Sequence, residues 1–147
     1  MNRKYFLSSL LTAGAVLTGV GSWATPVSLD KNSARKVPPF LKPGDTIGIC
    51  SPSGFISLAD IAPAVQLMES WGYRISIGAS PGQQEFIYGG TDSQRTKDLQ
   101  QMLDDPDIKA IMCARGGYGL VRIIDQLDFS RFKNNPKWII DFAKVPK

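Results

Sequence analysis

The run Ile108–Ala114 constrains the fold of this chain more than any other segment, because Lys109 alone interrupts its apolar side chains. Such a run is typical of a parallel strand that helices cover on both faces. Three further strands are predicted at Thr46–Cys50, Tyr73–Ile77 and Trp138–Ile140. The sequence between these strands therefore decides whether the sheet is parallel.

A helix is predicted at Leu58–Trp71, between the first two strands. Its apolar face is formed by residues at helical spacing: Ile61, Val65 and Met68, widened by Ala64, Leu67 and Trp71. Ser57 or Asp60 can cap its start, Pro63 fits only within its first turn, and Gly72 suits a left-handed stop.

Two more helices are predicted later in the chain. Thr91–Gln94 has the spacing of a capping box, and Asp105-Pro106 ends the helix that follows. Its apolar residues are Leu99, Met102 and Leu103. The residues that fit a third helix are Leu120, Val121, Ile123, Ile124 and Leu127. Strands that alternate with helices predict an α/β fold, with a partial parallel sheet flanked by helices.

The first 24 residues differ from the rest of the chain. Arg3 and Lys4 precede an apolar stretch, no charge follows before Asp30, and Ser22–Ala24 places small residues at a signal peptidase site. We interpret residues 1–24 as a signal peptide, with a membrane anchor as the alternative, residues 25–40 as a linker and residues 41–147 as the domain. The predicted location is therefore the periplasm or cell envelope, with membrane contact only through an uncleaved signal segment.

Charge and composition exclude several classes of function. Two of the positive charges behind the net charge of +4 lie in the signal segment, so no nucleic-acid partner is indicated. The 147 residues contain no His, which removes the usual general base and the commonest metal ligand. We predict neither a metal nor a cofactor. Cys50 and Cys113 are interpreted as two buried free thiols, although an exported protein could also form a disulfide.

Ligands of parallel α/β folds bind in loops at the carboxyl ends of the strands. These loops are Ser51–Gly54, Arg115–Gly119 and the segment after Ile140. Gly116 and Gly117 allow backbone N–H groups to approach an anionic oxygen, but three glycines can equally make a tight turn. No dinucleotide or Walker motif is present. Ser51 and Ser53, without a base, are interpreted as loop hydrogen-bonding residues.

An acidic cluster occurs in the chain where the second helix is predicted to end. Asp104, Asp105 and Asp107 surround Pro106. Because further metal ligands are absent from the neighbouring sequence, we interpret this cluster as a solvated turn.

Four blocks of sequence together resemble the LD-carboxypeptidases, a family of serine peptidases that includes murein tetrapeptide carboxypeptidases and microcin-immunity-type proteins. The blocks are Lys42–Asp45 with the following strand and Ser51–Gly54, then Phe86–Asp92 with Arg95, Asp98 and Leu99, then Asp107–Gly119, and finally Asn135–Ile140. The third is the most specific. The resemblance implies a Rossmann- or flavodoxin-like N-terminal domain, murein peptide as the partner and a possible homodimer.

The resemblance also implies a chemistry that this chain does not complete. The family cleaves the L,D-peptide bond to terminal D-alanine, using a Ser on a Gly-aromatic-Ser-Asp turn with a Glu and a His from a C-terminal domain. Here Asp141–Lys144 occupies that turn, and Ala143 stands at the nucleophile position. Gly116 and Gly117 correspond to the loop that binds the oxyanion.

We therefore predict a truncated and catalytically inactive LD-carboxypeptidase-like protein, with a truncation or frameshift after Ile140. Two alternatives stay open. One is a non-catalytic module that binds murein peptide or a partner, and the other is a part of an active serine carboxypeptidase.

Overall fold

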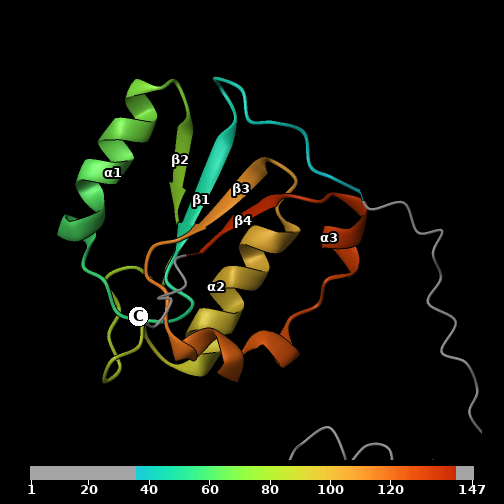
Figure 1. Ribbon diagram of the computed structural model, residues 1–147. Coiled ribbons are helices and arrows are strands. Elements are labelled where there is room, and N and C mark those ends of the chain that lie inside the picture. Colours follow the sequence, from blue (N-terminus) through green and yellow to red (C-terminus); the bar gives the residue numbers. More distant parts are fainter. Residues whose placement is uncertain (1–35, 142–147) are drawn as a thin grey trace, which may run out of the picture. The chain divides into compact units, whose positions relative to one another are not determined.

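A four-stranded parallel sheet organises residues 36–141, the part of the chain that this computed structural model describes (Figure 1). Its strands are β1 (Thr46–Cys50), β2 (Arg74–Ile77), β3 (Ile108–Cys113) and β4 (Trp138–Ile140). They lie in the order β2-β1-β3-β4. The predicted α/β class and parallel pairing are confirmed, and β3 is one residue shorter than the apolar run.

Helix α1 (Leu58–Ser70) packs on one face of the sheet. Ile47 and Ile49 of β1 and Ala110 of β3 form the sheet side of this core, and Ile61 and Met68 of α1 cover them. Ser57 caps the helix and Asp60 completes a capping box, so both residues named for the cap take part. Gly72 ends the helix with a φ of 87°, as predicted.

Two details of the α1 prediction are wrong. Ala64, Leu67 and Trp71 do not widen the buried face, because all three are exposed. Pro63 lies in the second turn of the helix, not the first. The missing Pro63 N–H would have bonded to Ala59 on the exposed side, where water can satisfy the free carbonyl.

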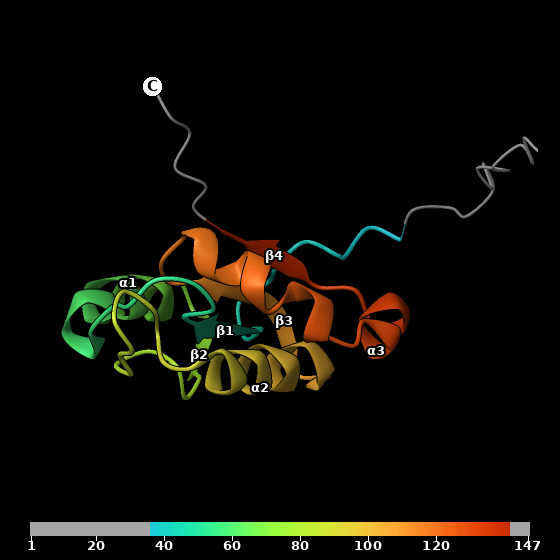
Figure 2. The same ribbon diagram turned by 90° about the horizontal axis from the view of Figure 1, so that it is seen from below.

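Helix α2 (Asp92–Asp104) packs on the other face, and Figure 2 shows it running along the sheet. Its apolar residues Leu99, Met102 and Leu103 meet Ile108 and Ile111 of β3. The approach to β1 is close because Gly48 has no side chain. A β-carbon there would lie 2.9 Å from the sulfur of Met102. Thr91 and Gln94 form the predicted capping box.

The predicted third helix is realised differently. Two short 3-10 turns, η1 (Tyr118–Arg122) and η2 (Ile124–Gln126), replace one α-helix, and a short α3 (Ser130–Asn134) follows. Ile123 lies between the two turns and is fully buried, and the helical path is interrupted at this residue. No side chain caps η1, whose N-cap is Gly117. An uncapped segment with β-branched residues is a poor α-helix, so burial of Ile123 decides its path.

Cys50 and Cys113 are register partners at the ends of β1 and β3, and both are buried free thiols. The prediction of free thiols is confirmed. A hydrogen bond with Cys113 and burial raise the pKa of the Cys50 thiol. Both sulfurs therefore serve as small core side chains.

Two sequence predictions lie outside the described residues. They are the signal segment, residues 1–24, and the nucleophile position, Ala143. Of the helices within residues 36–141, none combines the length and the apolar character that a membrane crossing requires.

Candidate functional site

The loops that follow β1, β2 and β3 gather at one edge of the sheet, the lower edge in Figure 1. They enclose an open hollow of about 420 Å³. Its lining comes from three segments: Gly54 and Phe55, then Gln84 with Phe86 to Tyr88, then Arg115 to Gly119. The first and third are the loops named from the sequence, so the structure brings them together.

The glycine loop, residues 115–119, opens its backbone to this hollow. Gly117 has a φ of 147°, a conformation that residues with a β-carbon rarely adopt. Within residues 36–141, the N–H groups of Gly116 and Gly117 have no backbone acceptor. Neighbouring donors of this kind can hold a negatively charged oxygen.

Gly119 ends the loop and serves packing. A β-carbon there would lie 2.7 Å from the Cα of Ser53 and 2.9 Å from its carbonyl oxygen. The glycines therefore divide by role. Gly117 gives the loop its conformation, whereas Gly119 lets the loop lie directly on the segment after β1.

Ser51 and Ser53 are buried and form hydrogen bonds in the loops, as predicted. The Ser51 hydroxyl donates to the carbonyl of Gly54, and the Ser53 hydroxyl accepts from the N–H of Leu120 at 3.1 Å. Neither hydroxyl faces the hollow as a nucleophile.

Arg95 of α2 joins three loops beneath the hollow and is fully buried. Its guanidinium and Nε donate to the carbonyls of Pro52, Gly90 and Gly119. The Gly90 and Gly119 contacts measure 3.1 and 2.9 Å. Each carbonyl belongs to a different loop, so one side chain fixes the relative positions of all three.

Asp98, one helical turn further along α2, anchors the loop after β2. Its carboxylate accepts from the N–H groups of Ala79 at 2.8 Å and Ser80 at 2.9 Å, and from the Ser80 hydroxyl. The Ser80 oxygen in turn accepts from the N–H of Ser51 at 2.7 Å. We use the name floor for the buried set Ser51, Ser53, Ser80, Arg95 and Asp98, which supports the loops around the hollow without lining it.

Tyr88 connects the floor to the surface. Arg95 lies 4.9 Å from the centre of the Tyr88 ring, and Arg122 lies 5.4 Å from it. Asp92 accepts from both arginines. The hydrogen bond from Arg122 and the charges of both arginines lower the pKa of Asp92.

Exposed side chains surround the opening. Phe86, Ile87 and Tyr118 are 86%, 72% and 91% exposed, and Phe86 is the one non-glycine residue with positive φ in residues 36–141. Arg115, also exposed, donates to the carbonyl of Phe55 at 3.0 Å. We call Phe86, Ile87, Arg115 and Tyr118 the rim. A strained, exposed aromatic beside a hollow is typical of a binding surface.

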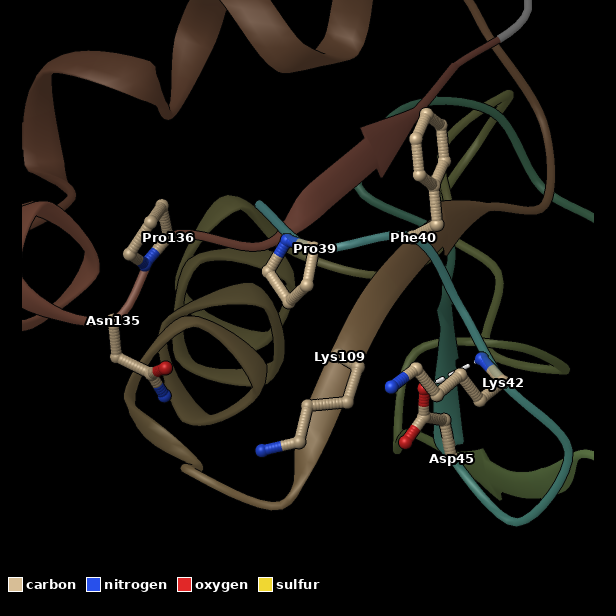
Figure 3. Close-up of a pocket in the computed structure, with 7 residues that line it drawn as sticks. All are labelled: Pro39, Phe40, Lys42, Asp45, Lys109, Asn135 and Pro136. Carbon is tan, nitrogen blue, oxygen red and sulfur yellow. Dashed lines mark hydrogen bonds between the residues drawn. The ribbon is translucent and has the colours of Figure 1, made fainter. Parts of the chain in front are cut away.

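A second hollow, of about 210 Å³, lies at the opposite edge of the sheet, where the strands begin (Figure 3). Lys109 donates there to the carbonyl of Pro106 at 2.6 Å, and the Lys42 N–H donates to Asp45. Phe40 stacks on Trp138. These groups bond to the protein's own chain, and this edge lies away from the glycine loop.

Metal binding has no support in the described part of the chain. Residues 36–141 contain no cluster of three His, Cys, Asp or Glu groups suited to a metal ion. Asp105 caps α2, and its carboxylate accepts from the N–H of Asp107. The acidic cluster is therefore a turn, as interpreted from the sequence.

Sequence reasoning did not assign roles to Arg95, Asp98 and Tyr88. A signal was present, because Arg95 and Asp98 share a helical face with Leu99 and Met102. Charged residues within a buried stripe are rare unless they are paired. Taken together, the described residues supply positioned hydrogen-bond donors and an exposed cation, but no nucleophile with a base.

Comparison with known proteins identifies the family of this chain. Residues 47–143 match the model of the LD-carboxypeptidase N-terminal domain. A candidate carboxypeptidase of Synechocystis sp. is 37% identical over 119 residues, which are 80% of this chain and 38% of that protein. The murein tetrapeptide carboxypeptidase of Pseudomonas aeruginosa is 28% identical over 67% of this chain and 33% of its own length.

Among solved structures, the microcin C7 self-immunity protein in complex with aspartyl sulfamoyl adenosine, known from Escherichia coli, superposes with a TM-score of 0.66. The match is 28% identical and covers 72% of this chain and 32% of that one. The chain thus spans about a third of the length of the relatives it matches. Because residues 47–143 match the N-terminal domain of the LD-carboxypeptidases, the chain belongs to the LD-carboxypeptidase family.

Proposed function

We propose that residues 36–141 bind the terminal part of a murein tetrapeptide, and that the glycine loop supplies the hydrogen bonds for its scissile carbonyl. The observation that carries this proposal is that Gly116 and Gly117 line the hollow and that their N–H groups have no backbone acceptor within residues 36–141. Donors fixed in advance around a developing oxyanion are a large source of catalytic stabilisation in acyl transfer.

The substrate class follows from the relatives. The Pseudomonas aeruginosa relative is named a murein tetrapeptide carboxypeptidase, and a Bacillus subtilis relative, 33% identical, carries the name of a murein peptide carboxypeptidase. The family resemblance adds that the bond broken joins an L-centre to terminal D-alanine. The hollow suits such a ligand, because it combines apolar walls with a few polar groups.

We further propose that the 147-residue chain does not itself hydrolyse the peptide. Ala143 stands where the family places its nucleophilic Ser, and the sequence contains no His to serve as a base. Substituting Ala143→Ser alone would not restore activity, since a Ser without a base stays protonated. The departures from the family pattern all follow Ile140.

Binding and turnover are tested separately. We expect the tetrapeptide to shift the amide NMR signals of the glycine loop, while no D-alanine is released above the buffer rate. Gly117→Ala should weaken binding, because the new side chain adds strain at a φ of 147° and a methyl group at the donors. Gly44→Ala is the matched control, since Gly44 also has positive φ but lies before β1 in open space. Equal binding by both variants would contradict the proposed role of the loop.

Export of this chain is also a proposal, supported by the basic start and apolar stretch of residues 1–24. The mature protein should begin near Thr25. N-terminal sequencing of protein from the cell envelope would contradict this if Met1 were retained.

A further inference from the structure

We infer that Arg115 recognises the C-terminal carboxylate of the bound peptide. The inference rests on the proposed function, and it adds the residue that would restrict the site to the ends of peptide chains. Three features of the hollow carry it: the place of Arg115 next to Gly116 and Gly117 in the lining, the way the side chain is held, and the bonding of the neighbouring arginines.

The first feature is spacing along the chain. In a substrate that loses its last residue, the terminal carboxylate lies one residue beyond the scissile carbonyl. One residue spans at most about 3.3–3.6 Å. Arg115 directly precedes Gly116 and Gly117, and all three line the same hollow. The cation therefore shares one hollow with the proposed oxyanion donors, as the terminal carboxylate and the scissile carbonyl share one end of the peptide.

The second feature is that the Arg115 side chain is held against the wall of the hollow. It passes over Gly54, where a β-carbon would lie 3.2 Å from its Cδ. One guanidinium nitrogen donates to the carbonyl of Phe55 at 3.0 Å. A guanidinium carries five N–H donors in a planar fork, so one protein bond leaves donors for both oxygens of a carboxylate.

The third feature is that the other nearby arginines are occupied. Arg95 is buried and bonds to three backbone carbonyls. Arg122 is paired with Asp92. Among the described residues that line the hollow, Arg115 is the only cation. Hydrogen bonds with Ser57 are the main cause of the lowered pKa of Asp60, and the charge of Arg115 is a smaller cause.

The test compares a murein tetrapeptide with its C-terminal amide, which lacks the charge and is otherwise the same. Binding to the 147-residue chain is measured by NMR titration. Wild type should bind the acid about tenfold more tightly than the amide, the order expected for a charge-assisted hydrogen bond. Arg115→Gln should remove this preference, and Arg115→Lys should keep part of it, because lysine is a point charge without the fork.

Arg131→Gln is the matched control. It removes the same charge from an exposed position in α3 and should leave the acid preference unchanged. Amide binding by Arg115→Gln reports whether the loop is intact. If that variant lost acid and amide binding equally, Arg115 would have only a structural role. Equal wild-type binding of acid and amide would overturn the inference while the proposed function stands. No wild-type binding of either peptide would overturn both.

Discussion

The floor and the rim of the hollow use similar residues in opposite ways. The floor contains an arginine, an aspartate and three serines, all buried. Each buried side-chain nitrogen and oxygen within residues 36–141 has a hydrogen-bond partner. The rim contains an arginine and three large apolar side chains, and all four are exposed. Arg95 and Arg115 show the contrast most directly, because the first bonds to three loops and the second to one carbonyl.

This difference shows how a site built on loops can be rigid. A buried polar group left without a partner is destabilising by about 1–3 kcal/mol, so the floor is strongly held in a single arrangement. The rim has no such constraint and remains accessible. The floor thus fixes where the glycine loop lies, and the proposed function has the rim meet the ligand.

Removal of the central floor residue should have the largest effect. In Arg95→Met, the carbonyls of Pro52, Gly90 and Gly119 lose their shared donor inside the protein. We expect the free energy of unfolding to fall by about 3–5 kcal/mol, the range for breaking a buried charged contact. Denaturant unfolding monitored by circular dichroism measures this change.

Arg122→Met is the control for this prediction. Arg122 shares Asp92 and Tyr88 with Arg95, but its side chain is 55% exposed. A much smaller loss is expected, because water replaces its bonds. Similar losses in the two variants would show that the arginine–tyrosine cluster, and not the contacts to three loops, stabilises the site.

Two glycines of the glycine loop, Gly117 in its middle and Gly119 at its end, provide the second comparison. Gly119→Ala should destabilise the protein by about 3 kcal/mol, because its methyl group would meet the backbone of Ser53. In Gly117→Ala the nearest atom is 3.8 Å away, so only backbone strain remains, about 1–2 kcal/mol. Thermal unfolding of both variants checks the order. A larger loss of stability for Gly117→Ala than for Gly119→Ala would show that the contact between Gly119 and Ser53 is not the tightest constraint on the loop.

The elements of the sheet were predictable, because their sequence signals are local. The apolar run of β3 and the capping box at Thr91 each specify an element without reference to distant residues. The structure of the segment after Gly119 was not predictable, because its apolar residues fit an α-helix that does not form. Its path depends on the burial of Ile123 beneath α2, a tertiary contact that a helical pattern does not contain.

The site was predictable in part for the same reason. The glycine loop and the loop Ser51–Gly54 can be recognised in the sequence because each follows a predicted strand and contains residues typical of turns. The structure brings the two loops together at one edge of the sheet. The floor was not predictable in detail, since Arg95 contacts Pro52, 43 positions earlier. A charged residue on an apolar helical face indicates a buried partner, but the fold determines which carbonyls it meets.

The smallest expected effect concerns Asp92, which lies next to the floor and accepts from Arg95 and Arg122. The hydrogen bond from Arg122 is the main cause of the lowered pKa of Asp92. A folded pKa below the unfolded value of 3.8 contributes stability at higher pH, which is lost as the pH falls through the folded pKa. The melting temperature of wild type should therefore drop more steeply than that of Asp92→Asn as the pH falls from about 5 to 2.

Asp128→Asn separates an ion pair from a hydrogen bond in the same experiment. The pKa of Asp128 is also lowered, but mainly by the hydroxyl and N–H of Ser130. Salt screens exposed charges more than it weakens neutral donors, so 1 M salt should reduce the contribution of Asp92 and largely preserve that of Asp128. An equal response to salt would mean that Arg122 does not hold Asp92 by charge. The link from Arg95 to Arg122 through Asp92 would then depend on hydrogen-bond geometry and not on charge.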